Sequence, residues 1–245
     1  MRVRPHGAFS RLAEGLYCVE GSFGRSPLGR RMTAVVLPSG RLALHSPIRM
    51  TPEGMAALDG LGQVAAILIP NSFHWSDARW YSERYPQASV LAPGGARTKL
   101  KSRLPVLSTL EDGWTEELAA GLARMPLKGL KTHEHAFFHP ASRTLILTDL
   151  VFNMGAGARG LTRLLLRLNQ SHGRFGPSRL LRWVFTSGKA ALLASVREMG
   201  QWDYERVIVS HGGVLERGGK AAMAAAFAEW GKTGESTGEA NGEAG

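Results

Sequence analysis

The chain has 245 residues, of which 44% are hydrophobic and 20% are charged, a composition typical of a globular protein with a sizeable core. Its single cysteine excludes both a disulfide framework and a zinc site built from several thiolates. The net charge of +10 comes with neither a glycine-rich phosphate loop nor a specific nucleic-acid-binding signature. The N-terminus has no apolar signal segment, and no apolar run reaches the ~20 residues of a membrane span. We therefore expect a cytoplasmic protein that does not span a membrane.

The first half of the chain predicts a hairpin followed by a strand–helix–strand unit. Apolar runs and turn residues indicate strands over 33–37 and 41–45, a helix that begins at Thr51 and Pro52, a strand over 64–69, a helix over 77–85 and a strand over 89–91. Two strands joined through a helix pair in parallel, whereas the hairpin is antiparallel. Mixed sheets are therefore expected.

The second half repeats this mixture of hairpin and helical patterns. The predicted elements are a helix over 116–124, a hairpin of strands 136–139 and 144–148, a helix over 189–199, a strand over 206–210 and a helix over 220–230. We expect residues 1–230 to form a single domain. Residues 231–245 contain no large apolar side chain, so they are predicted to be a disordered tail.

A strongly basic segment interrupts the second half. Residues 150–197 include no Asp or Glu, and arginines are concentrated over 159–182. A predicted helix there carries four leucines on one face and two arginines off it: Leu161, Leu164, Leu165, Leu168, Arg163 and Arg167. One interpretation is a helix that packs its leucines on the core and exposes a basic rim. The other is a surface for phosphate-bearing ligands, anionic lipid or nucleic acid.

Side chains that bind metals or move protons follow several predicted strands. The strand over 206–210 ends on His211, which two glycines follow, and the strand over 144–148 ends on Asp149. Ligands in open α/β sheets lie beyond the carboxyl ends of the strands. Further histidines occur at 71–74 and 132–135. The alternatives are a histidine that only hydrogen-bonds a neighbouring loop and an aspartate that caps a local turn.

Two of these motifs resemble the metallo-β-lactamase superfamily. The run Thr144-Leu-Ile-Leu-Thr-Asp149-Leu-Val-Phe is similar to the strand that ends in the bridging aspartate of that family, and Val207-Ile-Val-Ser-His211-Gly212 is similar to its last ligand histidine. The order of elements matches from about residue 16 to residue 230. The resemblance implies an α/β fold, a four-layer αββα sandwich with mixed sheets, and metal ligands on loops at one edge of the two sheets.

The middle ligand of the family falls near His133, with Glu134 and His135 as alternatives. The first motif of the family, His-x-His-x-Asp-His, is degenerate in this chain. Reading it from the strand end places these residues at the ligand positions: Asn71, Phe73, Trp75 and Ser76. Shifting it by one residue makes His74 the second histidine and gives these residues at the other positions: Ser72, Ser76 and Asp77. We expect Asp77 to be the N-cap or a first-turn acid of the next helix.

The degenerate first motif argues against a binuclear site, which needs more ligands. If His74, His133, Asp149 and His211 converge, they could hold a single metal ion. Three nitrogens and one oxygen suit zinc or iron better than magnesium. With Asp149 and His211 as catalytic residues, the chain would hydrolyse a small-molecule ester, amide, thioester or phosphoester through metal-activated water. The alternatives are redox chemistry at a one-iron site, and a non-catalytic protein that lost the metal and binds an anionic ligand through residues 159–182.

Overall fold

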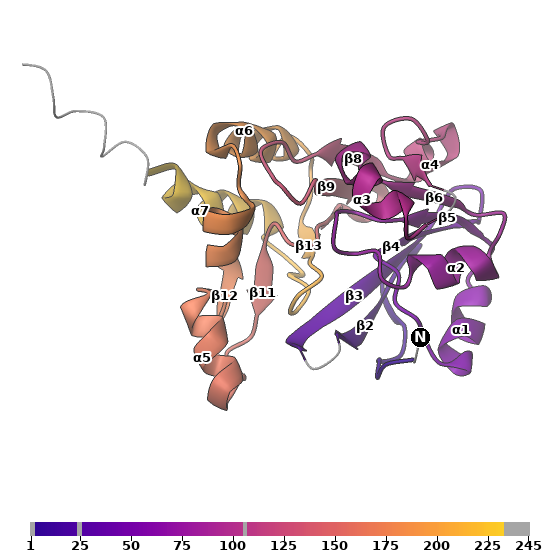
Figure 1. The fold of residues 1–245 in the computed structure, drawn as a ribbon, viewed down its shortest axis with the longest axis horizontal. Helices are drawn as coiled ribbons and strands as arrows, with labels where there is room; N and C mark the ends of the chain where they lie inside the picture. The colour runs from indigo at the N-terminus through magenta and orange to yellow at the C-terminus, as the bar shows by residue number, and fades with distance from the viewer. Residues whose placement is uncertain (1–2, 24–25, 105–106, 233–245) are drawn as a thin grey trace, which may run out of the picture.

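Two β-sheets face each other through apolar side chains, and helices cover their outer faces (Figure 1). The computed structural model describes residues 3–23, 26–104 and 107–232. The seven-stranded sheet contains β1 (Ser10–Ala13), β2 (Leu16–Phe23), β3 (Ser26–Val36), β4 (Leu42–His45), β5 (Val64–Leu68), β6 (Ser89–Ala92) and β7 (Ser108–Thr109) in that order. Strands β1 to β4 are antiparallel, and β4 to β7 are parallel.

The second sheet has four strands in the order β13-β10-β9-β8. They are β8 (Ala123–Pro126), β9 (His135–His139), β10 (Thr144–Ile146) and β13 (Arg206–Ile208). Strands β10 and β13 are parallel neighbours, so their carboxyl ends reach the same edge of the sheet. A separate two-stranded sheet pairs β11 (Phe152–Met154) with β12 (Arg174–Gly176).

The helices complete the outer layers. They are α1 (Pro52–Asp59), α2 (Ala78–Arg84), α3 (Arg97–Lys101), α4 (Glu116–Gly121), α5 (Gly160–Leu168), α6 (Lys189–Met199) and α7 (Gly219–Lys232), with the short turns η1 (Gly94–Ala96), η2 (Pro140–Ser142) and η3 (Leu181–Phe185). Apolar residues of α1, α2 and α3 pack on the seven-stranded sheet, and those of α6 and α7 pack on the four-stranded sheet. Within the described residues, no helix is long and apolar enough to span a lipid bilayer.

Alternation of side chains along the strands produces these layers. Leu42 and Leu44 of β4 lie in the core beneath α1 and α2, whereas Ala43 between them lies in the core between the sheets. In β10, Leu145 faces the α6–α7 layer and Ile146 faces the other sheet. Both faces of each central strand are therefore buried, because successive side chains point to opposite sides. The chain is the predicted αββα sandwich.

Most predicted elements are confirmed at or within a few residues of their expected bounds. Thr51 caps α1 through a bond from the Gly54 amide, and both predicted hairpins are antiparallel. The helix predicted over 116–124 ends earlier, because residues 123–126 form β8 and pair with β9. Of the predicted tail, 231–245, the first two residues continue α7 and the others lie outside the described residues.

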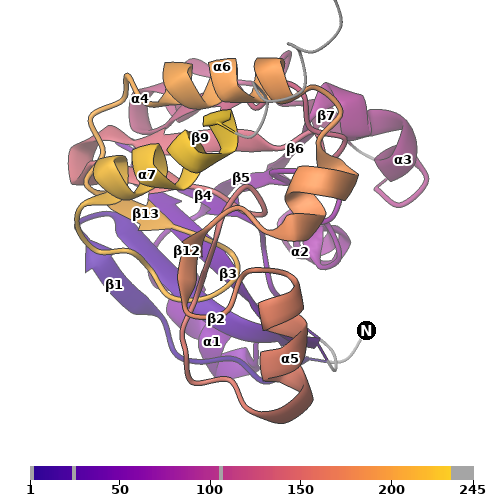
Figure 2. The ribbon, with the colours of Figure 1, turned by 90° about the vertical axis from the view of Figure 1, so that its left-hand side faces the viewer.

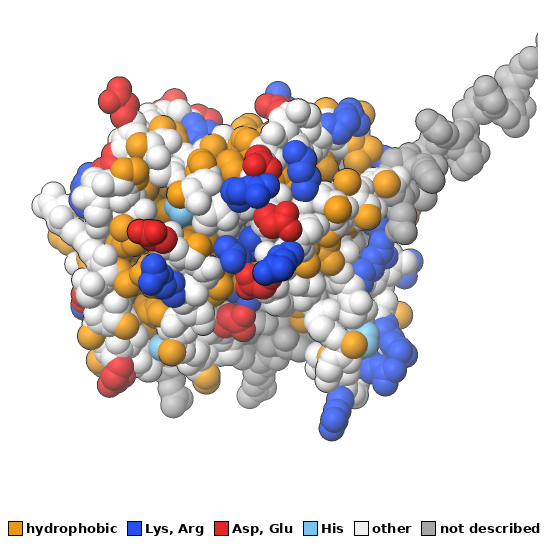
Figure 3. Space-filling view, turned by 180° about the vertical axis from the view of Figure 1, so that it is seen from behind, with side chains coloured by type: hydrophobic (Ala, Val, Ile, Leu, Met, Phe, Trp, Pro, Cys, Tyr) orange, Lys and Arg blue, Asp and Glu red, His pale blue; other side chains and the backbone are white. Residues whose placement is uncertain are grey.

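Helix α5 corrects one expectation from the sequence. Its four-leucine face does not pack on the core: Leu161, Leu164, Leu165 and Leu168 are all exposed, and Leu166 on the opposite side is buried. The helix stands at one end of the molecule, away from α6 (Figures 1 and 2). Viewed from behind, Lys and Arg side chains gather over this region at the lower right (Figure 3). The interpretation of a leucine face packed on the core is therefore wrong.

Candidate metal centre

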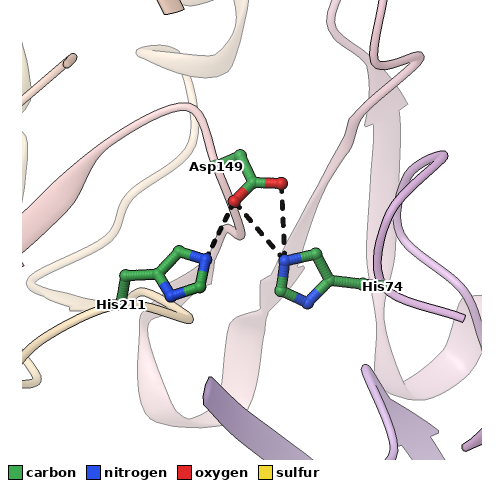
Figure 4. Close-up of side chains that lie close together, drawn as sticks. All are labelled: His74, Asp149 and His211. Carbon is green, nitrogen blue, oxygen red and sulfur yellow. Dashed lines mark hydrogen bonds and ion pairs between the residues drawn. The ribbon is translucent and has the colours of Figure 1, made fainter. Parts of the chain in front are cut away.

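His74, Asp149 and His211 meet at the edge of the two sheets (Figure 4). Asp149 follows β10 and His211 follows β13, so the parallel pairing of these strands brings both residues to one edge. His74 reaches them from the loop between β5 and α2. One ligand atom from each residue lies within 4.8 Å of the others. The Nε2 atom of His211 is 3.1 Å from Asp149 Oδ1, and that of His74 is 3.4 Å from the same oxygen.

Both imidazole rings are held by their other nitrogen. The Nδ1 atom of His211 lies 2.6 Å from the Gly29 carbonyl oxygen, which only accepts, so the proton must be on Nδ1. The Nδ1 atom of His74 lies 2.7 Å from the Ser46 hydroxyl. Partners of this kind fix the orientation of metal-binding histidines and direct Nε2 at the metal. Both Nε2 atoms here point at Asp149 (Figure 4).

Ser46 holds its position with a left-handed backbone. Its φ is 54°, an uncommon value for a residue other than glycine, and its amide donates to the Leu68 carbonyl at the end of β5. Such conformations persist where surrounding structure enforces them, and they occur often at functional sites. The conformation of Ser46 places its hydroxyl on His74.

Asn71 joins the loop of His74 to Asp149. Its side chain is fully buried, and its Oδ1 accepts from the amides of Phe73 and His74 at 2.8 and 3.0 Å. Its Nδ2 donates to Asp149 Oδ2 at 2.7 Å. Reading the family motif from the strand end placed Asn71 at a ligand position. In the structure its side chain instead positions the Asp149 carboxylate and the loop of His74. An asparagine directly after a buried strand was the only sequence signal for this role.

Glu134 fixes the Asp149 turn from the other side. Its fully buried carboxylate accepts from the amides of Thr148, Asp149 and Leu150 at 2.8, 3.1 and 3.3 Å. Burial and, next, the charge of Asp149 together raise the pKa of Glu134 to about 7, against the opposing effect of the amide hydrogen bonds. Glu134 therefore supports the site without belonging to the three-residue group.

The structure does not bring His133 or His135 to this group. His133 is exposed with a φ of 54°, and its ring lies against Gly95, where an added Cβ would stand 2.3 Å from Nδ1. His135 is buried at the start of β9, with Nε2 3.4 Å from Glu111 Oε1, and burial lowers its pKa to about 4. The four-residue set expected from the sequence thus becomes a set of three, because the chain turns His133 away.

Arg31 is a further positioning residue that sequence reasoning missed. Its guanidinium is buried and donates to the carbonyls of Val209 and Gly212, on either side of His211. Asp77, predicted to cap α2, stands at the N-cap but makes no cap bond with its side chain. Its carboxylate instead pairs with Arg30 and accepts from the Arg49 amide at 3.0 Å.

The electrostatics of the group favour a charged carboxylate. Burial by itself raises the pKa of Asp149, but the charges and hydrogen bonds of His74 and His211 outweigh burial and hold this pKa below its usual range. Burial lowers the pKa of His211, yet the Asp149 hydrogen bond and charge and the Gly29 carbonyl raise it overall. An ionised carboxylate next to imidazoles is the protonation state that a divalent cation requires of its oxygen ligand.

The three residues line a pocket of about 530 Å³. Its walls are largely apolar and include Leu28, Phe73, Trp75, Phe152, Leu181 and Phe185. Phe152 stacks on the His211 ring with centroids 5.0 Å apart. Lys99 also lines the pocket, with Nζ 4.6 Å from the centroid of the Phe73 ring. The size suits a small molecule, because ligand sites are commonly apolar cavities of about 300–1,000 Å³ with a few polar groups.

The donor set fits a transition metal. Two imidazole nitrogens and one carboxylate oxygen are ligands that zinc and iron share, and three protein ligands leave a coordination position open. The Nδ1 partners of both histidines leave Nε2 for the metal. The group therefore meets the requirements of a catalytic metal site with its open side on the pocket.

No protein-family model matches the sequence, and no curated protein matches it. Solved structures do match the fold. A diflavin flavoprotein fragment from Nostoc sp. PCC 7120 is 13% identical with a TM-score of 0.67, and the match covers 95% of this chain and 97% of that one. The metallo-β-lactamase FIM-1 from Pseudomonas aeruginosa, in its mono-zinc form, is 11% identical with a TM-score of 0.59, covering 93% and 97%.

A metallo-β-lactamase from Hirschia baltica is 12% identical with a TM-score of 0.58, and the match covers 91% of this chain and 97% of that one. The sequence identity of all three structures is far too low for an activity to be transferred, so they show the similarity of the fold alone. They agree with the two-sheet, four-layer arrangement of this chain. The chain has the fold of the metallo-β-lactamase superfamily.

Proposed function

We propose that the protein is a metal-dependent hydrolase whose single metal ion is held by His74, Asp149 and His211. The observation that carries this proposal is the convergence of three ligand atoms within 4.8 Å at the wall of a 530 Å³ pocket. A bound zinc or iron ion would supply Lewis acidity and lower the pKa of a water molecule that it binds. FIM-1, which shares the fold, has a mono-zinc form, and this supports the proposal of a single ion.

The surrounding residues would have separate tasks. Asn71 holds the Asp149 carboxylate, Glu134 holds the backbone turn that carries it, and the Ser46 hydroxyl orients the His74 ring. The apolar walls would bind the hydrocarbon part of a substrate and exclude water from it. Lys99 would offer a positive charge to an anionic or carbonyl oxygen on the same substrate.

The apolar lining favours an ester, thioester, amide or phosphoester with a hydrocarbon group beside the scissile bond. A panel of such substrates should be tested with metal-free protein and with protein reconstituted with zinc or iron. We expect hydrolysis of at least one class only after reconstitution, its loss in Asp149→Asn, and its retention in His133→Ala. Equal rates with and without metal, or an active Asp149→Asn protein, would refute the proposal.

A non-catalytic binding function remains the second candidate. It is favoured by the exposed arginines of the 159–182 segment, among them Arg163 and Arg167. This candidate predicts that charge reversal at these two arginines abolishes function, whereas His211→Ala and Asp149→Ala leave it intact. The hydrolase proposal predicts that His211→Ala and Asp149→Ala abolish function, whereas charge reversal at the two arginines leaves it intact.

A further inference from the structure

Exposed apolar side chains are concentrated on one surface. Of the eight large hydrophobic residues that are exposed in the described part of the chain, seven belong to α5, η3 and the residue before η3. They are Leu161, Leu164, Leu165, Leu168, Leu180, Trp183 and Val184, and their exposed fractions run from 47% to 79%. We call these seven residues the α5–η3 surface. Soluble proteins rarely leave such a group uncovered without an interaction to make.

Arginines surround the α5–η3 surface, and acidic residues are absent from the segment that forms it. Residues 150–197 contain no Asp or Glu. Arg159, Arg163, Arg167 and Arg179 are exposed. In Figure 3 the blue side chains over α5 form a group without red ones among them. The surface is therefore apolar at its centre and cationic at its margin.

Helix α5 divides these two properties between its faces. The exposed leucines fall within about 100° of one another around the helix axis, while Arg163 and Arg167 lie on the flank between them and the buried Leu166. A helix of this kind lies in the plane of a membrane, with leucines in the acyl boundary and arginines reaching the headgroups. Trp183, the most exposed apolar residue, is of the type enriched at membrane interfaces.

The surface is also connected to the pocket. A groove of about 320 Å³ is lined by Leu165, Leu168, Leu180, Trp183 and Val184, together with Asn169 and Arg179. Asn169 and Leu180 line the pocket of the candidate metal centre as well. An amphiphile held at the α5–η3 surface would thus lie beside the mouth of that pocket.

We propose that the α5–η3 surface binds the protein peripherally to bilayers that contain anionic phospholipids. A second copy of the chain explains the surface less well, because symmetrical contact would oppose arginines to arginines. A nucleic acid would engage the arginines but leave the leucine face in water. An anionic bilayer satisfies both parts, since headgroups attract the cations and acyl chains cover the leucines.

Vesicle flotation tests this proposal directly. The full chain should float with vesicles of phosphatidylglycerol and phosphatidylcholine, bind pure phosphatidylcholine much more weakly, and dissociate as salt rises. The Arg163→Gln/Arg167→Gln variant should bind about 25-fold more weakly, about fivefold for each charge. Arg79→Gln/Lys101→Gln, which removes two exposed charges from α2 and α3, is the matched control and should bind as the unchanged protein does.

Leucine substitutions test the apolar part. Leu164→Asn/Leu165→Asn should lower the partition coefficient at least about tenfold, and Leu164→Met/Leu165→Met should restore it. These side chains are exposed, so the variants should fold. His211→Ala should bind vesicles normally, which separates this proposal from that of a metal-dependent hydrolase.

Three outcomes would overturn the proposal. The first is no flotation with anionic vesicles. The second is equal loss of binding in the Arg79/Lys101 control. The third is a dimer, seen by sedimentation, that the asparagine variant dissolves while vesicles bind neither protein, since the surface would then be a contact between copies of the chain.

Discussion

The Nδ2 atom of Asn71 donates a hydrogen bond to Oδ2 of Asp149 across 2.7 Å, and this bond ties the loop after β5 to the turn after β10. The two residues are 78 positions apart in the chain and follow strands of different sheets. Because Oδ2 is engaged in this way, Oδ1 is the oxygen nearest His211 Nε2, at 3.1 Å. One buried amide thus helps to orient the carboxylate of the candidate site.

Replacing Asn71 with Ala should loosen Asp149 and weaken metal binding by about 10–100-fold, as loss of an outer-shell partner commonly does. It should also lower the free energy of unfolding by about 1–3 kcal/mol, because buried partners lose a hydrogen bond. Titration with zinc and chemical denaturation measure the two effects. Thr148→Val removes only the second acceptor of the Asn71 amide and should reduce both metal affinity and stability less than Asn71→Ala does. Metal affinity unchanged in Asn71→Ala would contradict the positioning role.

Ser46 adopts an energetically costly left-handed backbone conformation, and its hydroxyl contacts the His74 ring. Both Ser46→Ala and Ser46→Gly remove the hydroxyl and should weaken metal binding to a similar extent. They should differ in stability, because glycine adopts a φ of 54° without the cost of about 1 kcal/mol that alanine meets. Ser46→Gly should therefore unfold at a higher temperature than Ser46→Ala. The reverse order would show that the left-handed backbone is not strained.

Gly212 should resist substitution far more than Gly40 or Gly155 does. Its φ is +98°, and an added Cβ would lie 2.0 Å from the Asn153 carbonyl oxygen, so Gly212→Ala must shift the loop that carries His211. We expect a loss of more than about 2 kcal/mol in the free energy of unfolding. Gly40→Ala shares a positive φ but has open space and should cost about 1 kcal/mol. Gly155→Ala meets neither a positive φ nor a steric clash and should change stability least. Comparable losses of stability in all three variants would contradict the constraint on Gly212.

His45 should make the protein sensitive to acid. It is buried beside Phe137 with no hydrogen-bond partner for its ring among the described residues, and burial, followed by the neighbouring His74, lowers its pKa to about 3. The unfolded chain therefore binds the proton first, and stability should be complete above pH ~6.5 and fall as the pH drops towards 3. Between pH 7.5 and pH 5, the free energy of unfolding of His45→Phe should fall by about 1–2 kcal/mol less than that of the unchanged protein. Chemical denaturation at the two pH values measures this difference. An equal loss in both proteins would contradict this assignment.

One rule about strand ends predicted two of the three meeting residues from the sequence, whereas the four layers were implied by the family resemblance. Asp149 and His211 end apolar runs, and apolar runs of that kind form central strands whose carboxyl ends share an edge. His74 was identified from its position after another strand. His133 was wrongly grouped with them, because sequence spacing contains neither its positive φ nor the proximity of Gly95.

Other features depended on contacts that no local pattern encodes. Glu134 reaches the amides of 148–150, and Arg31 reaches carbonyls 178 and 181 positions away. The period of the leucines in α5 was recognised, but a period shows only which residues share a face. Whether another element covers that face depends on the rest of the chain, and here none of the described elements does.

Metal stoichiometry and affinity test the central claim most directly. Protein purified without a histidine tag should be stripped with a chelator, reconstituted with zinc or iron, and analysed for metal. We predict about one ion per chain, loss of that ion in His74→Ala, Asp149→Ala and His211→Ala, and full retention in His133→Ala. Folded protein that takes up no metal, or that loses it only in His133→Ala, would contradict the site described above.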